Sequence, residues 1–141
     1  MMNREDALEL LRGGPKGIEK WNEVRPAVPH LECAELDHAN LEHANLDRAA
    51  LDGADLEGAD LLDCHLVGAS LQGVNLEAAD LRGADLQGAD LWGADLQKAK
   101  LQGANLRDAN LTGANLRHAN LVGANLDGAK GVNLAGAIIE E

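Results

Sequence analysis

Leucine recurs at every fifth position of this chain, from Leu31 to Leu126, without interruption. Alanine usually stands two positions before each leucine, Asp or Asn stands one position before it, and glycine is commonest two positions after it, as in Ala-Asp-Leu-Glu-Gly at 54–58. On an α-helix, five-residue steps would rotate successive leucines by about 140° and form no stripe. On a flat strand, an odd step would send them to opposite faces. The pattern therefore predicts a chain that turns a corner every five residues.

Within each unit, apolar and polar positions alternate, which places alanine and leucine inside and the residues between them outside. Glycine suits the corner because corners often require a positive φ. The Asp and Asn side chains can accept hydrogen bonds from nearby backbone and so support a turn. Many short sides that close on themselves make a solenoid, in which each coil pairs with the next at about 4.8 Å.

These Ala-(Asp/Asn)-Leu-X-Gly units resemble the repeats of the pentapeptide-repeat family. The resemblance implies a β-solenoid, specifically a right-handed quadrilateral β-helix, in which four units make one coil and residues twenty apart stack. The regular units at 29–128 then make about five coils. After them, Ala-Lys-Gly at 129–131 is a shortened unit, so 129–141 is a phase-shifted C-terminal segment that either bulges or tightens the last coil.

Residues 1–28 do not repeat, and they predict an N-terminal α-helical cap followed by an extended linker. Asn3 is a typical helix-start residue, the glycines at 13–14 end the first helix, and Pro15 suits the first turn of a second one. Such a cap would cover the inner leucines and the backbone edge of the first coil. The alternative interpretation is a helical element that binds a partner.

Negative charge dominates the chain, which has 24 acidic and 12 basic residues and a formal net charge of −12. Binding to a nucleic acid backbone requires Lys and Arg, so this charge argues against direct contact with nucleic acid and also with anionic membranes. No apolar run approaches the roughly 20 residues of a transmembrane helix, and the first residues do not resemble a signal peptide. We therefore expect a cytoplasmic protein.

One face of the predicted coil carries a stack of acidic side chains, and the acids of the chain are concentrated near the helical end. Between positions 31 and 63 there are ten acids and one base, Arg48. Like charges stacked about 4.8 Å apart cost stability. The face is either simply solvated or a surface that tolerates repulsion in order to bind a cationic partner. Its candidate partner-contact residues are Glu35, Asp37, Asp55, Glu57 and Glu77.

Three apolar residues are predicted to point outward, namely Leu62, Val67 and Trp92. Scattered exposed apolar residues are commonplace, whereas a lone tryptophan is also a good interface anchor. We treat all three as candidate contacts for a partner.

No residue pattern indicates a catalytic, cofactor-binding or metal site. Cys33 is predicted outside and Cys64 inside on a different side of the coil, too far apart for a disulfide. None of the spacings among the five histidines resembles a zinc motif, and neither a phosphate loop nor a nucleophile motif is present. We therefore expect a protein that is not an enzyme.

The leading hypothesis is a non-enzymatic scaffold that presents flat, ladder-like faces to a protein partner of unknown identity. The alternative follows from the resemblance: some pentapeptide-repeat proteins, including the fluoroquinolone-resistance group, resemble duplex DNA and bind DNA gyrase, a type II topoisomerase. The present chain is acidic in the same way, but it lacks the phenylalanines common in that group. At the far end, Ile138 and Ile139 lie beside an uncapped last coil and predict a weak homodimer.

Overall fold

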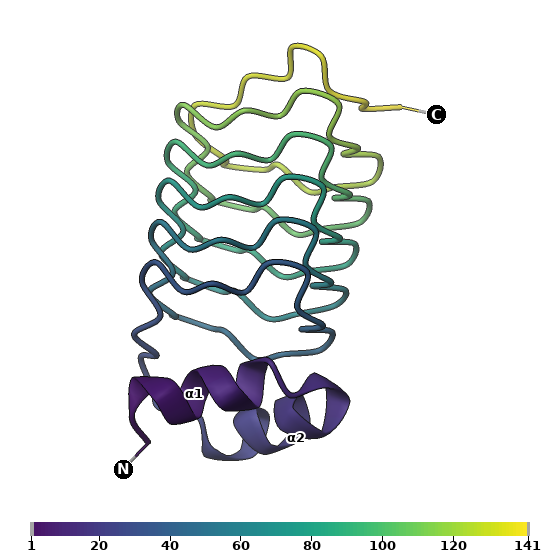
Figure 1. Ribbon diagram of the computed structural model, residues 1–141. Coiled ribbons are helices and arrows are strands. Elements are labelled where there is room, and N and C mark those ends of the chain that lie inside the picture. The colour runs from purple at the N-terminus through teal and green to yellow at the C-terminus, as the bar shows by residue number, and fades with distance from the viewer. Residues whose placement is uncertain (1, 141) are drawn as a thin grey trace.

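The computed structural model describes residues 2–140. Two helices, α1 (Arg4–Leu11) and α2 (Gly14–Val24), lie at the N-terminal end, and the remaining chain winds into a stack of coils that stands on them (Figure 1). The side chain of Asn3 caps α1 by accepting the N–H of Asp6 at 2.8 Å, and Pro15 lies in the first turn of α2. Both helix starts agree with the sequence prediction.

Parallel β-bridges join residues twenty positions apart along the rod, from His30–Ala50 to Asn110–Lys130. In most regular units the leucine N–H donates to the next coil, as from Leu56 to the Asn75 carbonyl at 2.8 Å. The polar residue before the leucine donates to the previous coil, as from Asn75 to the Ala54 carbonyl at 3.0 Å. The predicted twenty-residue stacking is confirmed.

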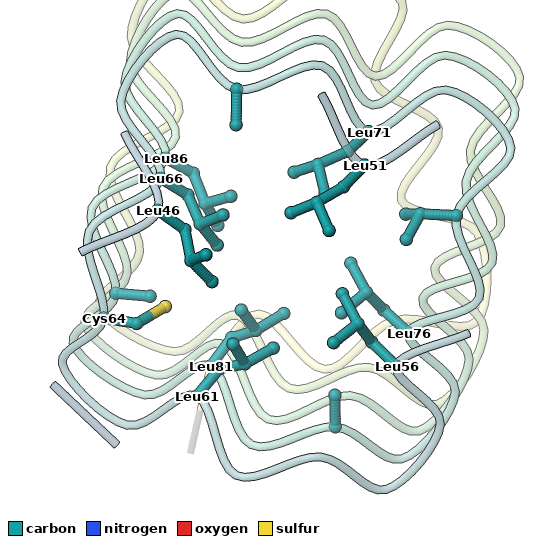
Figure 2. Packing of buried hydrophobic residues seen from close by; sticks show 14 of the residues in the cluster. Leu46, Leu51, Leu56, Leu61, Cys64, Leu66, Leu71, Leu76, Leu81 and Leu86 are labelled. Carbon is teal, nitrogen blue, oxygen red and sulfur yellow. The ribbon is translucent and has the colours of Figure 1, made fainter. Parts of the chain in front are cut away.

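The interior of the rod is a set of stacked leucines. Figure 2 shows four sides around the axis, with Leu56 and Leu76 stacked on one side and Leu61 and Leu81 on the next. These side chains are fully buried, as are the alanines between them. Burial of a leucine contributes about 1.5–3 kcal/mol, so a core without Phe or Tyr is sufficient when every unit supplies one leucine.

Corners require a positive φ, and glycine meets that requirement in most units, as at Gly58 with φ 63°. Gly58 also suits this corner because it has no side chain: a Cβ there would collide with the His38 ring, which would have to move. Several corners nevertheless carry a side chain in the same left-handed conformation, at a cost of about 1–3 kcal/mol each. These residues are Cys33, His38, His43, Arg48, Asp63, Ala78, Lys98, Asp108 and His118.

Asp and Asn side chains hold the turns, as the sequence predicts. Asp60 Oδ1, for example, accepts the N–H of Leu62 at 3.1 Å. Some units lack this acceptor, and two of them carry His65 and Ser70 at that position. In these two units, carboxylates of the previous coil accept the bond instead. The Val67 N–H donates to Asp47, and the Gln72 N–H donates to Asp52, both at 2.8 Å.

Side chains of the helices bind the open backbone edge of the first coil. The Arg4 guanidinium donates to the carbonyls of His30 and Glu32, at 3.2 and 2.7 Å. Trp21 is fully buried, and its Nε1–H donates to the Asn45 carbonyl at 2.8 Å. Sequence reasoning missed the edge contacts made by arginines. Their signal is the cluster of Arg residues in the non-repeating start of an otherwise acidic chain.

The last coil is two residues shorter than the others. Asn110 and Lys130 are bridged twenty positions apart, but Asn120 and Ile138 only eighteen. The unit at 129–131 accounts for the difference, because it lacks a leucine and the residue that follows a leucine. Of the two sequence alternatives, tightening of the coil is therefore the one observed.

Candidate interaction surfaces

Five carboxylates predicted to share a face do share it. Glu35 and Asp55 are joined by a β-bridge, and the column of Asp37, Glu57 and Glu77 follows the same side. The links in this column are hydrogen bonds from the next corner residues: the His38 N–H donates to the Glu57 carbonyl at 2.7 Å, and the Gly58 N–H donates to the Glu77 carbonyl at 2.9 Å. We call this side of the rod, defined by these five residues, the acidic face.

None of the five carboxylates lies within ion-pair distance of a basic group anywhere in residues 2–140. Their local partners are neutral: Asp55 Oδ1 accepts the Glu57 N–H at 3.0 Å and a long contact from the Asn75 amide at 3.4 Å. Stacked carboxylates repel one another at coil spacing. Arg12, at the end of α1, lies at one end of this face, where its guanidinium donates to the Glu35 carbonyl at 2.7 Å and lines a cavity with Glu35 and Asp37. The five carboxylates themselves have no ion-pair partner in the described part of the chain.

The neighbouring side of the rod shows the opposite arrangement. Arg82 donates two hydrogen bonds to the Asp80 carboxylate, at 2.8 and 2.7 Å. This hydrogen bonding holds the pKa of Asp80 below its usual value. An arginine of the coils therefore pairs with a stacked acid on this side, whereas the acidic face has no such ion pair in residues 2–140.

The three outward apolar candidates do not join the acidic face. Leu62 and Val67 lie on two adjacent sides, one on each side of the corner at Asp63, and both are half-buried. Trp92 stands on another side, in a column between Gln72 and Thr112, and 54% of its surface is exposed. The eight predicted contact residues thus divide among all the sides of the rod.

Among residues 2–140, no three His, Cys, Asp or Glu side chains gather closely enough to hold a metal ion. Cys33 is exposed and Cys64 buried, and both are free thiols. Burial raises the pKa of the Cys64 thiol, which disfavours the reactive thiolate. Neither helix of the described chain is long and apolar enough to cross a bilayer.

Comparison with known proteins identifies the repeat. The family model for pentapeptide repeats, eight copies long, matches residues 34–73, 64–103 and 94–130. The chain belongs to the pentapeptide-repeat family. Solved members of this family form right-handed quadrilateral β-helices, in agreement with the four-sided coil seen here. No protein of curated function matches this pentapeptide-repeat protein.

Two similar structures come from cyanobacteria. Rfr23 from Cyanothece 51142 is 34% identical with a TM-score of 0.59, over 83% of this chain and 67% of that one. HetL from Nostoc sp. PCC 7120, a protein involved in heterocyst differentiation regulation, is 38% identical with a TM-score of 0.54. The alignment with HetL covers 78% of this pentapeptide-repeat protein but only 61% of HetL. A third similar structure is a thylakoid-lumen protein of Arabidopsis thaliana, 29% identical with a TM-score of 0.50, over 73% of this chain and 68% of that one.

Proposed function

We propose that this pentapeptide-repeat protein is a non-enzymatic scaffold of about five coils that binds a protein partner through its acidic face. The observation that carries the proposal is the stack of five carboxylates without a basic partner in residues 2–140. Their mutual repulsion lowers stability, and a partner that presents Lys or Arg relieves it on binding. The partner is therefore a protein with a basic surface.

Other features support binding rather than chemistry. The sides of the rod are ladders of short polar side chains on a rigid backbone, which suits a flat contact with another protein. Trp92 adds an exposed aromatic anchor on a second side, and Leu62 and Val67 offer smaller apolar contacts. Free cysteines in the described chain favour a reducing compartment and hence a cytoplasmic location.

Reversing charge on the acidic face is expected to abolish partner capture. We expect the wild-type protein to retain a basic protein from a lysate of its native host, and to release it as salt increases, because exposed charges are screened. The double variant Glu57→Lys, Glu77→Lys is expected to retain at least about tenfold less, which corresponds to ~1.4 kcal/mol. Affinity capture followed by quantitative mass spectrometry measures both.

The control for this experiment is Gln87→Lys, which places a lysine at an exposed position on another side of the rod. We expect this variant to capture the partner as the wild type does. Equal capture by all three proteins would show that the acidic face is not the contact surface. Trp92→Ala, tested in parallel, asks whether the tryptophan side takes part.

A second candidate function is that of an acidic DNA mimic that binds a type II topoisomerase such as DNA gyrase. The observation that favours it is the line of stacked carboxylates along one side of a narrow rod, since a row of negative charge is what a nucleic acid backbone presents to its binding proteins. Inhibition of gyrase supercoiling by the wild type, but not by Glu57→Lys, Glu77→Lys, would support this candidate. Absence of inhibition at saturating protein would remove it.

The C-terminal coil is the proposed site of weak self-association. Ile138 and Ile139 are 46% and 56% exposed, and inner residues of the last coil such as Leu126 and Leu134 are only half-buried. Apolar side chains beside an unpaired backbone edge favour pairing with a second copy. The contact is small compared with the roughly 1,000 Å² of a stable interface, so the homodimer is weak.

Sedimentation at increasing protein concentration is expected to show a monomer that pairs reversibly. The variant Ile138→Lys, Ile139→Lys is expected to remain monomeric over the same range, because it adds two charges to the proposed contact. A wild-type protein that stays monomeric at every concentration would contradict the homodimer.

A further inference from the structure

The shortened last coil leaves backbone groups without partners on the side that carries the acidic face, at its opposite end. In the preceding coil, Leu96 donates its N–H to the Asn115 carbonyl at 2.8 Å, and Asn115 donates to the Ala94 carbonyl at 2.9 Å. These two bonds make up the bridge between Asp95 and Asn115. The bridge that would join Asn115 to the last coil is missing within residues 2–140.

Three backbone groups are left open here, two by the missing bridge and one by a missing corner bond like the one that Gly93 makes to the Thr112 carbonyl in the coil below. In the part of the chain that the structure describes, the amides of Gly113 and Leu116 have no acceptor, and the carbonyl of Ala114 has no donor. Leu116 and Ala114 are only 2% and 7% exposed, whereas Gly113, at the corner, is exposed. Buried N–H and C=O groups normally find a partner.

A cavity of about 340 Å³ opens beside these groups. The residues on its two sides belong to successive coils: Gly113, Ala114, Asn115, Leu116, Arg117, Asn133 and Ala135. We call this cavity the C-terminal notch. Because Asn133 and Ala135 of the last coil lie across it, the notch has room for a small ligand rather than for a continuous peptide strand.

One basic side chain lines the C-terminal notch in a protein of net charge −12. Arg117 lines it, and no carboxylate of residues 2–140 forms an ion pair with this guanidinium. Lys98 is bonded through its amide to the Arg117 carbonyl at 3.0 Å, and His118 is the next corner residue. One acid, Asp95, lies a coil below, bridged to Asn115.

We propose that the C-terminal notch binds a small phosphate, either as the inorganic ion or as a phosphate monoester. The open amides of Gly113 and Leu116 donate to its oxygens, and Arg117 supplies the balancing charge, as backbone N–H groups and arginine do at other phosphate sites. The Ala114 carbonyl is the group that distinguishes phosphate from sulfate, because it needs a hydrogen-bond donor. Protonated phosphate has an O–H to offer it, and sulfate does not.

Titration of the labelled full chain with inorganic phosphate, followed by NMR at the Gly113 and Leu116 amides, tests the site. We expect saturable shifts at both amides, and binding of sulfate at least about tenfold weaker because its contact with the Ala114 carbonyl is unsatisfied. Glycerol phosphate is the second arm. Tighter binding of the ester assigns the site to phosphorylated molecules, and tighter binding of the inorganic ion assigns it to free phosphate. Absence of saturable shifts, or equal affinity for sulfate, would overturn the proposal.

Arg117→Gln is expected to weaken phosphate binding by about tenfold or more, as loss of a charged hydrogen bond does. The matched control is Arg107→Gln, another exposed arginine, which pairs loosely with Asp108 at 3.9 Å on a different side. We expect its phosphate affinity to equal that of the wild type. The same loss in both variants would reduce the effect to net charge and contradict a specific site.

Insertion of Leu-Gln between Lys130 and Gly131 provides an independent test, because it restores the five-residue unit. The bridge at Asn115 is then expected to form, with protection of the Leu116 amide from hydrogen exchange and a higher melting temperature. Phosphate binding is expected to be lost, since the same backbone groups are now paired. Wild-type phosphate affinity in this folded variant would overturn the proposal.

Discussion

Replacement of Leu76 with aspartate is expected to unfold the rod. Leu76 is fully buried and stacks on Leu56 in the interior (Figure 2). Loss of a buried leucine costs about 2–5 kcal/mol, and an ionised carboxylate in a dry core adds several more. A solenoid is stabilised by contacts between neighbouring coils, so a break in a middle coil separates the two halves. Circular dichroism and thermal melting are expected to show loss of the cooperative transition.

Gln87→Asp is the matched control for Leu76→Asp, because it introduces the same carboxylate at an exposed position of the coil. Substitutions at such positions usually change stability by less than about 0.5 kcal/mol, so its melting curve is expected to overlay that of the wild type. An unchanged curve for Leu76→Asp itself would contradict the packing of leucines seen in the interior.

Removal of residues 1–25 is expected to make the protein associate or aggregate. The deletion takes away the Trp21 indole bonded to Asn45 and the Arg4 guanidinium bonded to His30 and Glu32. It also uncovers Leu31, which is 1% exposed in the intact chain. An uncovered edge of unpaired backbone groups beside apolar side chains is a template for pairing with another chain. Light scattering measures the resulting increase in size.

Trp21→Ala provides a point-variant version of the same experiment. Truncation of a buried tryptophan costs about 3–5 kcal/mol, so we expect α2 to detach and the variant to share part of the association. Glu19→Gln, an exposed change on the same helix, is expected to remain monodisperse. A deletion variant that is as monodisperse and as stable as the intact chain would show that the helices are not needed as a cap.

The coil architecture was predictable because each unit carries its own instructions. Every five residues supply an inward leucine and a residue at the corner, and most units add an Asp or Asn that holds the turn, as at 54–58. None of these choices depends on a distant part of the chain. The same local regularity made the acidic face predictable, since residues twenty apart must stack once four units close a coil, as Glu35 and Asp55 do.

Contacts between coils were not predictable from the five-residue pattern. The carboxylate of Asp47 holds the turn at Val67 one coil away, and this depends on the distance between two stacked coils rather than on either unit alone. The binding of Arg4 to the edge carbonyls likewise depends on how α1 docks. Non-glycine corners such as Ala78 are accepted because the surrounding ladder holds the backbone in place.

By itself, then, the sequence determined the winding, the leucine interior, the corners and the face on which five acids stack, because all of these follow from a local unit repeated at constant length. Only the tertiary structure decided what happens where that length changes. The short unit at 129–131 is visible in the sequence, but tightening and bulging were equally compatible with it. The last coil must close against the one beneath it with two residues fewer. It closes by giving up the bridge at Asn115, and the C-terminal notch is the physical consequence.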